Sequence, residues 1–361
     1  MDVTLFGGAY SGRRVLVTGH TGFKGSWLAL WLQEMGAEVT GIALPPDTSP
    51  NHWDMLGLPV RDLRLDIRDT KNLAEAMAAA EPEIVFHLAA RSLVRRSYRE
   101  PLDTWSTNVL GTANILETCR NMKGVRAIVA VTTDKVYENR DWPWGYREVD
   151  ALGGRDPYSA SKAATELLIA SYRNSFFSGE EAPRIASARA GNVIGGGDWS
   201  EDRLIPDIVR ATARGESVEI RYPNATRPWQ HVLECLAGYL LLGQRLLARE
   251  EPAAEAWNFG PDARDNRTVR QVLGAMSTYW PDFAWHPSHA EHPHEAGLLY
   301  LDTAKARSWL NWHPVWTLDE ALEKTATWYR AHSGGEPALT RQQLSEYVAA
   351  SRDRGVVWSR V

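Results

Sequence analysis

A tyrosine and a lysine four residues apart are the strongest candidates for chemistry in this chain. Asp156 and Pro157 precede them, and an aspartate N-cap followed by proline predicts that a helix begins there. Tyr158 and Lys162 would then share one face of that helix. A nearby ammonium favours the phenolate, and tyrosine, with a reference pKa of about 10, needs that help to act as a base. The pair therefore predicts a group that takes the proton of a substrate hydroxyl.

A second cluster of polar residues follows the apolar run 127–132, which reads as a buried strand. Thr133, Asp134 and Lys135 come directly after it. In open α/β sheets chemistry lies beyond the carboxyl ends of the strands, so we expect Thr133 to lie beside Tyr158 and Lys162. For Asp134 and Lys135 the alternative is an ordinary surface ion pair.

Three glycines near the start of the chain predict a dinucleotide-binding turn. The strand 14–18 runs into Gly19, Gly22 and Gly25, and apolar residues at helical spacing follow. Glycine allows a tight turn and close approach of the backbone to a pyrophosphate, which the start of the helix then binds. The spacing is G-x-x-G-x-x-G rather than the commoner G-x-G-x-x-G, so a glycine turn in some other α/β protein stays an alternative.

The adenosine end of the cofactor site is less well determined. The second strand ends Gly-Ile-Ala-Leu-Pro-Pro at 41–46, with neither an acid nor an arginine, which leaves NAD or NADP open. Asp66, at the end of the expected strand 61–67, is suited to contact adenine. The predicted cofactor, NAD, would be bound by Gly19, Gly22, Phe23, Lys24, Gly25, Asp66, Ile67, Leu88, Ala89, Ala90, Thr132, Tyr158 and Lys162.

The elements that position these residues alternate between strand and helix. Strands are expected at 38–44, 61–67, 84–90 and 127–132, and helices at 70–80 and 108–122. This order predicts an α/β fold with a Rossmann-type, doubly wound parallel sheet. The alternation becomes irregular after Arg189. We therefore expect an NAD-binding domain from 1–191 plus about 231–260, and a smaller mixed α/β substrate domain from about 192–230 plus 261–361.

Composition excludes several classes of protein. The chain has 361 residues, a net charge of −5 and two cysteines, which argues against a nucleic-acid binder and a disulfide framework. No run is long and apolar enough for a membrane span or a secretory signal, so a cytoplasmic location is expected. A histidine cluster at His286, His289, His292 and His294 does not fit a helical zinc motif, and no metal is predicted.

Several separated stretches carry a resemblance to a known family. They are TGHTGFKGSWLALWL, VTTDKVYENRDWPWGYRE, GGRDPYSASK, YRNSFF, RAGNVIGGGDWSEDRLIPDIVRA and RPWQHVLE. Together they resemble the nucleotide-sugar 4,6-dehydratases of the extended short-chain dehydrogenase/reductase superfamily, from about residue 14 to 316. The resemblance implies a cytidine diphosphate sugar as substrate, and a homodimer or dimer of dimers that pairs through helices at about 101–122 and 158–176.

The resemblance also implies a redox-neutral dehydration. Tyr158 would take the proton of the sugar O4 while the C4 hydride passes to NAD+, Thr133 would hydrogen-bond O4, and Lys162 would hold the nicotinamide ribose. Asp134 would protonate the leaving C6 hydroxyl. Lys135 stands where the family has its base for the C5 proton; alternatively Lys135 stays charged and stabilises the enolate, and Asp134 performs both transfers.

The substrate side offers candidate ligands for a diphosphate. Arg203 and Arg227 are predicted to bind it, because a guanidinium matches phosphate oxygens, and Asn192 would donate to the same group. Each arginine has a solvated surface position as its alternative. Arg91, where the family usually has glutamine, would add charge near the nicotinamide or the substrate. The aromatic loop 137–148 would wall the sugar site or simply pack.

Two other functions share part of this pattern. A nucleotide-sugar 4-epimerase would also use Tyr158, Lys162 and the glycine turn, but it removes no water and has no use for Asp134 and Lys135. A non-catalytic, NAD-responsive binding protein would not need Thr133, Tyr158 and Lys162 intact.

Overall fold

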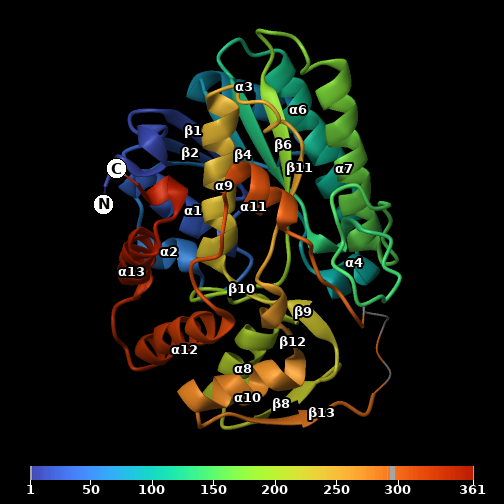
Figure 1. Ribbon diagram of the computed structural model, residues 1–361, viewed down its shortest axis with the longest axis vertical. Helices are drawn as coiled ribbons and strands as arrows, with labels where there is room; N and C mark the ends of the chain where they lie inside the picture. Colours follow the sequence, from blue (N-terminus) through green and yellow to red (C-terminus); the bar gives the residue numbers. More distant parts are fainter. Residues whose placement is uncertain (1, 291, 293–296, 361) are drawn as a thin grey trace.

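A parallel sheet forms the centre of the protein. The computed structural model describes residues 2–290, 292 and 297–360. Within them, seven strands pair in parallel in the order β11-β6-β5-β4-β1-β2-β3, which confirms the predicted α/β class and doubly wound sheet (Figure 1). The strands are β1 (Arg14–Thr18), β2 (Glu38–Ala43), β3 (Arg61–Arg64), β4 (Ile84–His87), β5 (Ala127–Val131), β6 (Arg184–Ala190) and β11 (Ala256–Phe259).

Helices cover both faces of the sheet because successive strand residues point to opposite sides. Val15 and Val17 of β1 belong to one apolar core, and Leu16 between them belongs to the other. The first core takes α1 (Phe23–Glu34) and α9 (Val232–Leu247); the second takes α3 (Thr70–Ala80), α6 (Thr112–Arg120) and α7 (Pro157–Ser175). The N-terminal part of the chain also forms shorter helices: η1 (Leu5–Gly8), α2 (His52–Leu56), α4 (Val94–Arg99), α5 (Pro101–Trp105) and η3 (Asp134–Val136).

The start of α7 is as predicted. The Asp156 carboxylate accepts a hydrogen bond from the Ser159 amide at 2.9 Å, and Pro157 is the first helical residue. The cap satisfies an amide that has no partner within the helix. Tyr158 and Lys162 therefore occupy successive turns of one helix face.

The helix expected at 108–122 differs in its first turn. A π-helical segment, Ser106–Gly111, precedes α6. Within it the buried Asn108 side chain donates to the Arg91 carbonyl and the Ser161 hydroxyl, and accepts from the Arg91 amide. A widened turn of this kind commonly marks a site where a side chain must reach a particular partner.

Two strands, β3 and β4, end three residues earlier than expected, and they do so at the edge where the site lies. β4 ends at His87 because the next amides, of Leu88 and Ala89, bond to the Thr18 hydroxyl, each at 3.2 Å. β3 ends at Arg64, so Asp66 lies in the following loop rather than in the strand. The residues that follow β3 and β4 thus form loops at the edge of the sheet where the glycine turn lies.

A smaller mixed α/β region lies below the carboxyl ends of the strands in Figure 1. Its described residues form three two-stranded sheets. Trp229, Trp280 and Trp328 contribute to its separate apolar core. Its elements are β7 (Val193–Ile194), α8 (Leu204–Ala213), β8 (Ser217–Ile220), β9 (Thr226–Pro228), β10 (Gln230–His231), η4 (Ala263–Asp265), β12 (Asn266–Thr268), α10 (Val269–Tyr279), β13 (Ala284–Pro287) and α12 (Leu318–Ser333).

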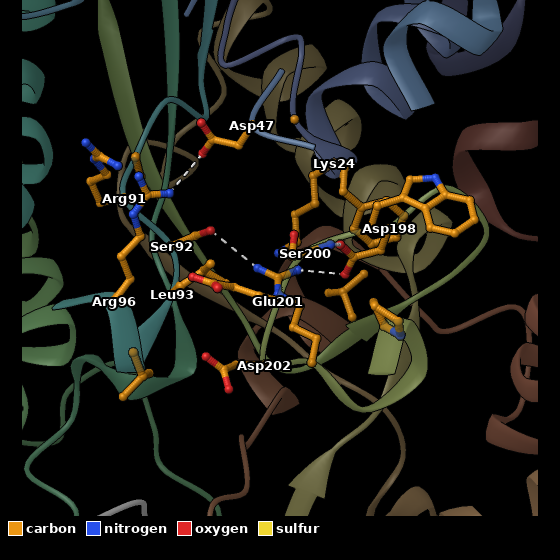
Figure 2. Close-up of a pocket in the computed structure, with 18 of the residues that line it drawn as sticks. Lys24, Asp47, Arg91, Ser92, Leu93, Arg96, Asp198, Ser200, Glu201 and Asp202 are labelled. Atoms are coloured by element: carbon orange, nitrogen blue, oxygen red, sulfur yellow. Dashed lines mark hydrogen bonds and ion pairs between the residues drawn. The ribbon is translucent and has the colours of Figure 1, made fainter. Parts of the chain in front are cut away.

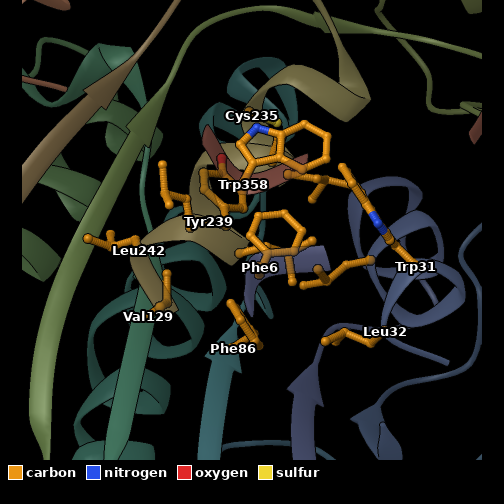
Figure 3. Packing of buried hydrophobic residues seen from close by; sticks show 14 of the residues in the cluster. Phe6, Trp31, Leu32, Phe86, Val129, Cys235, Tyr239, Leu242 and Trp358 are labelled. Carbon is orange, nitrogen blue, oxygen red and sulfur yellow. The ribbon is translucent and has the colours of Figure 1, made fainter. Parts of the chain in front are cut away.

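The C-terminal part of the chain returns to the sheet. The predicted division assigned all of 261–361 to the smaller domain, whereas Trp312, Tyr347 and Trp358 pack in the core beside α1 and α9. The elements involved include α11 (Ala304–Leu310), α13 (Thr340–Asp353) and η5 (Val357–Ser359). Figure 3 shows Trp358 beside Phe6, and their rings stack with centroids 4.9 Å apart. The domain limits themselves stay a prediction.

No α-helix in the described ranges combines the length and the apolar character that crossing a membrane requires. Cys119 and Cys235 are both free and buried.

The packing of Trp358 predicts a large loss of stability on truncation. Trp358→Ala should lower the free energy of unfolding by about 3–5 kcal/mol, because it removes a buried ring that contacts Phe6, Trp31 and Tyr347. Trp309→Ala is the matched control, since Trp309 is 60% exposed and should change stability by no more than about 0.5 kcal/mol. Urea unfolding followed by circular dichroism measures both, and equal midpoints would contradict the assignment.

Candidate active site

One large cavity brings the predicted site residues together. It has a volume of about 940 Å³ and lies between the carboxyl ends of the strands and the smaller region (Figure 2). All predicted residues except Asp134 line it: Gly19, Gly22, Phe23, Lys24, Gly25, Asp66, Ile67, Leu88, Ala89, Ala90, Thr132, Thr133, Lys135, Tyr158, Lys162, Asn192, Arg203 and Arg227. Residues from both halves of the chain thus face one space.

The glycine turn has the close packing that a dinucleotide-binding turn needs. Gly19 has φ +74°, and a Cβ there would lie 2.7 Å from the Ala89 amide nitrogen. A Cβ on Gly25 would collide with the Gly19 carbonyl, whereas Gly22 has room for one. No side chain caps the start of α1, so its amides point toward the cavity unsatisfied. These features fit a bound pyrophosphate.

The adenosine end contains two acids that already have partners. Asp66 forms an ion pair with Arg68, with Oδ2 and Nη2 2.6 Å apart, and hydrogen bonds from Arg68 hold the pKa of Asp66 below its usual value. Asp47, just beyond β2, pairs with Arg96 across the cavity mouth at 3.4 Å. Asp47 was not predicted, although it stands close to the position where an acid was expected and found missing.

Tyr158 and Lys162 are both buried at the cavity wall. Burial raises the pKa of Tyr158 to about 12, and the largest opposing influence is a hydrogen bond with the Thr133 hydroxyl. The Lys162 amine donates to the Val131 carbonyl at 3.1 Å. Burial, reinforced by the Lys24 ammonium, lowers the pKa of Lys162 to about 8. The Thr133 contact is as predicted, while the influence of Lys162 on the phenol stays a prediction.

Asp134 and Lys135 form an ion pair between a fully buried carboxylate and a partly exposed amine at the cavity, which differs from the ordinary surface ion pair considered above. The Lys135 amine lies 3.0 Å from Asp134 Oδ1 and 3.3 Å from Asn192 Oδ1. The Thr133 hydroxyl donates to the same Asp134 oxygen at 3.0 Å. Asp134 is fully buried, and its Oδ2 has no hydrogen-bond partner within the described part of the chain. Lys135 faces the cavity, and Asp134 lies behind Lys135 and Thr133.

The predicted diphosphate ligands converge on the substrate side. Arg203 donates to the buried Asp198 carboxylate at 3.0 Å and to the Ser92 hydroxyl at 3.3 Å, as Figure 2 shows. Arg227 is buried and donates to the Thr226 carbonyl at 2.8 Å. The burial of Arg227 contradicts the alternative of a solvated surface side chain for that residue. Arg203 is held by its two hydrogen bonds, while 32% of its side chain stays exposed.

Two further expectations are decided by packing. Arg91 lines the cavity, but Asp103 and Glu100 pair with its guanidinium, so it does not bring an unbalanced charge to the site. In the aromatic loop, Trp142 and Tyr146 stack with centroids 5.2 Å apart and lie outside the cavity lining. Trp142 and Tyr146 therefore pack rather than wall the site, and Trp144 is exposed.

The histidine cluster lies away from the cavity. His286 and His292 contact the hydroxyls of Ser217 and Ser288, respectively, and His294 falls outside the described residues. Within the described residues, no three His, Cys, Asp or Glu side chains come together in a group that could hold a metal ion.

Some residues near the site were missed by the sequence reasoning. Arg95, Asp198, Asp202 and Arg221 line the substrate side. Glu166 lies behind the cavity, on the same helix face as Lys162 and one turn further on. An acid four residues after a catalytic lysine was the signal that could have found it.

Comparison with known proteins places the chain among enzymes that act on sugar nucleotides. The model of the GDP-mannose 4,6 dehydratase family matches residues 16–325. A CDP-glucose 4,6-dehydratase from Salmonella typhimurium is 48% identical over 353 residues, which are 95% of this chain and 98% of the relative.

Solved structures share the fold. An epimerase from Methanothermobacter thermautotrophicus aligns with a TM-score of 0.80 at 25% identity, covering 92% of this chain and 96% of the epimerase. A dTDP-glucose 4,6-dehydratase from Streptomyces venezuelae, solved with NAD bound, aligns with a TM-score of 0.74 at 25% identity, covering 89% of this chain and 98% of the neighbour. With the family model and the 48% identical relative, these matches show that the chain belongs to the nucleotide-sugar 4,6-dehydratases.

Proposed function

We propose that this protein converts CDP-D-glucose to CDP-4-keto-6-deoxy-D-glucose and water, with NAD as its cofactor. The observation that carries the proposal is the contact between buried Asp134 and Lys135 directly beside the hydrogen-bonded Thr133 and Tyr158. An epimerase needs Thr133 and Tyr158 but not Asp134 and Lys135, because it removes no water. The choice of cytidine diphosphate follows the 48% identical relative, which is a CDP-glucose 4,6-dehydratase.

NAD fits the glycine turn and the strand ends that line the cavity. When bound, it supplies a reversible hydride acceptor, which makes C4 a ketone and so acidifies the C5 proton. The turn at Gly19 and Gly25 and the amides at the start of α1 hold the pyrophosphate. Lys162 holds the nicotinamide ribose through its ammonium.

Tyr158 takes the proton of the sugar O4. Its burial opposes ionisation, so the phenolate depends on nearby donors and positive charge. The Thr133 hydroxyl hydrogen-bonds the phenol and, with substrate present, O4. Lys162, one turn along the helix, supplies the positive charge.

The Asp134–Lys135 couple performs the elimination. In this step a proton passes from Lys135 to Asp134 across their 3.0 Å contact, which leaves a free amine facing the cavity. The amine removes the C5 proton, while a proton from Asp134 lets the C6 hydroxyl leave as water. Asp134 lies behind the cavity wall, so its proton reaches the sugar through the Thr133 hydroxyl or the Lys135 amine, which both contact its Oδ1. Return of the hydride to C6 completes the product together with a proton for C5, which Lys135 gives back. The O4 proton that Tyr158 took passes through the Thr133 hydroxyl to Asp134, so every group ends as it began.

Arg203, Arg227 and Asn192 bind the diphosphate of the substrate. The Asp198 carboxylate fixes the direction of Arg203, so its guanidinium is preorganised for phosphate oxygens.

We further propose the predicted division into an NAD-binding and a nucleotide-sugar-binding domain, with the C-terminal packing segments added to the former. The two buried, free cysteines are in keeping with a cytoplasmic location.

The function predicts a defined product. Incubation with CDP-glucose and NAD+ should give a product that has lost the mass of one water and absorbs as a 4-ketose in base, measured by mass spectrometry and spectrophotometry. Tyr158→Phe should lower kcat by about 10²–10⁴-fold, because it removes the proton acceptor for O4. A C4 epimer of unchanged mass would instead favour an epimerase, and no turnover of any nucleotide sugar a binding protein.

The role of Lys135 predicts a specific isotope result. Lys135→Met keeps the length of the side chain and removes the amine, so exchange of the C5 hydrogen with solvent deuterium should fall about 10²-fold or more. Asp134→Asn is the matched variant and should allow C5 exchange while slowing loss of water. Exchange at the wild-type rate in Lys135→Met, read by NMR, would exclude Lys135 as the base.

The exposed helices predict a homodimer. Apolar side chains stand exposed on α5, the adjoining π-helical turn and α7, which pack side by side; they are Leu102, Trp105, Leu110, Leu167 and Phe176. Leu167→Arg should shift the protein from dimer to monomer in analytical ultracentrifugation, since it places a charge within this face. Trp309→Arg, at an equally exposed site on α11, should not. A wild-type monomer would refute the proposal.

A further inference from the structure

We infer that Glu166, which does not touch the cavity, is a positioning residue for the proposed reaction: it joins the end of β5 to α7 and keeps a negative charge near the Lys162 ammonium. The inference rests on the function proposed above. Glu166 lies four residues after Lys162, so the two side chains occupy successive turns of α7.

Three side chains bind the Glu166 carboxylate. The Thr132 hydroxyl donates to Oε1 at 2.5 Å, and the Ser187 hydroxyl donates to Oε2 at 2.7 Å. Arg189 donates to Oε2 at 2.8 Å. Thr132 directly precedes Thr133, so Glu166 connects the helix that carries Tyr158 and Lys162 to the strand end that carries the other reacting groups.

The network continues beyond Glu166 without reaching solvent. Arg189 also donates to the Tyr137 hydroxyl at 2.9 Å, and Tyr137 donates to Asn258 of β11 at 2.6 Å. All of these side chains are buried. Nε of Arg189 has no hydrogen-bond partner within the described residues, but the bonds named above link side chains of β5, β6, β11 and α7 and help hold these elements in one relative position at this end.

The charges around Lys162 explain why a carboxylate is needed there. Burial and the Lys24 ammonium of α1 oppose protonation of Lys162, while Glu166 favours it. His87 of β4 is neutral, because burial lowers its pKa to about 3.

Glu166 itself stays ionised inside the protein. Burial opposes ionisation, but Arg189 of β6 and the hydroxyls of Thr132 and Ser187 bring the pKa of Glu166 below its usual value. Arg173, on the same helix, also feels the Glu166 charge, and Glu148 and Tyr137 face Arg189 from the loop. Glu166 is therefore the anion that offsets burial of the Lys162 ammonium.

The sign of the pH effect follows. The proposed reaction needs Lys162 protonated, so activity falls as the pH rises through the Lys162 pKa. Without the Glu166 charge, Lys162 loses its proton at lower pH. Glu166→Gln should therefore move the alkaline limb of kcat downward by about one pH unit or more, with KM for the nucleotide sugar unchanged.

A matched control separates this role from general stability. Glu234→Gln removes another buried carboxylate, which accepts hydrogen bonds from Val315, Trp316 and Tyr347 on the far side of α9. It should change the melting temperature and leave the alkaline limb in place. Because Glu166→Gln leaves Arg189 without its partner, the double variant E166Q/R189M, which removes both charges, is made alongside it.

The NAD+ affinity gives a readout that does not depend on turnover. NAD+ is titrated at a series of pH values and followed by tryptophan fluorescence. As the pH rises, the loss of NAD+ affinity should begin at a lower pH in E166Q than in the wild type, because Lys162, whose ammonium holds the ribose, loses its proton earlier. If kcat and NAD+ affinity both fall at the same alkaline pH in the folded variants as in the wild type, the inference is overturned. A wild type inactive on every nucleotide sugar would overturn the proposed function, and the affinity profile would still decide the role of Glu166.

Discussion

The contact between the end of β5 and α7 is the constraint on which the whole site depends. Three successive turns of the helix meet three successive residues of the strand end: Tyr158 meets Thr133, Lys162 meets Val131 and Glu166 meets Thr132. A slip by one residue would break all three contacts at once. The acid and amine that follow Thr133 are carried into place by the same alignment.

This alignment holds charged groups in a place where water cannot solvate them. Removing a charge from water costs several kcal/mol unless a partner compensates for it. Asp134 has Lys135, Glu166 has Arg189, and Asp198 has Arg203. Each of these anions thus has a cation within 3.0 Å. Lys135 of the first pair and both members of the third line the cavity, and the pairs compensate the charges of the three carboxylates.

The cavity also depends on how two parts of the chain face each other. Segment 92–99 lies on the sheet side, and loop 198–203 belongs to the smaller region. Arg95 pairs with Asp202 at 3.2 Å, and Arg99 pairs with Glu201 at 2.8 Å. Arg203 donates to Ser92, whose side chain is labelled in Figure 2. These contacts bring the arginines of the substrate side opposite the glycine turn, so the two proposed binding regions, one for the cofactor and one for the substrate, face the same cavity.

The sequence alone determined the features that depend on local spacing: the parallel α/β sheet, the start of α7, the glycine turn, and the approach of Thr133 to Tyr158. Periodicity and capping act between residues a few positions apart, so they can be read directly. Tertiary structure decided the burial of Asp134, the pairing of Arg91 with Asp103, the return of Trp358 to the sheet and the pairing of Glu166 with Arg189. Each of these depends on which side chain fills a space or balances a charge, and for most of them the partner lies far away in the chain.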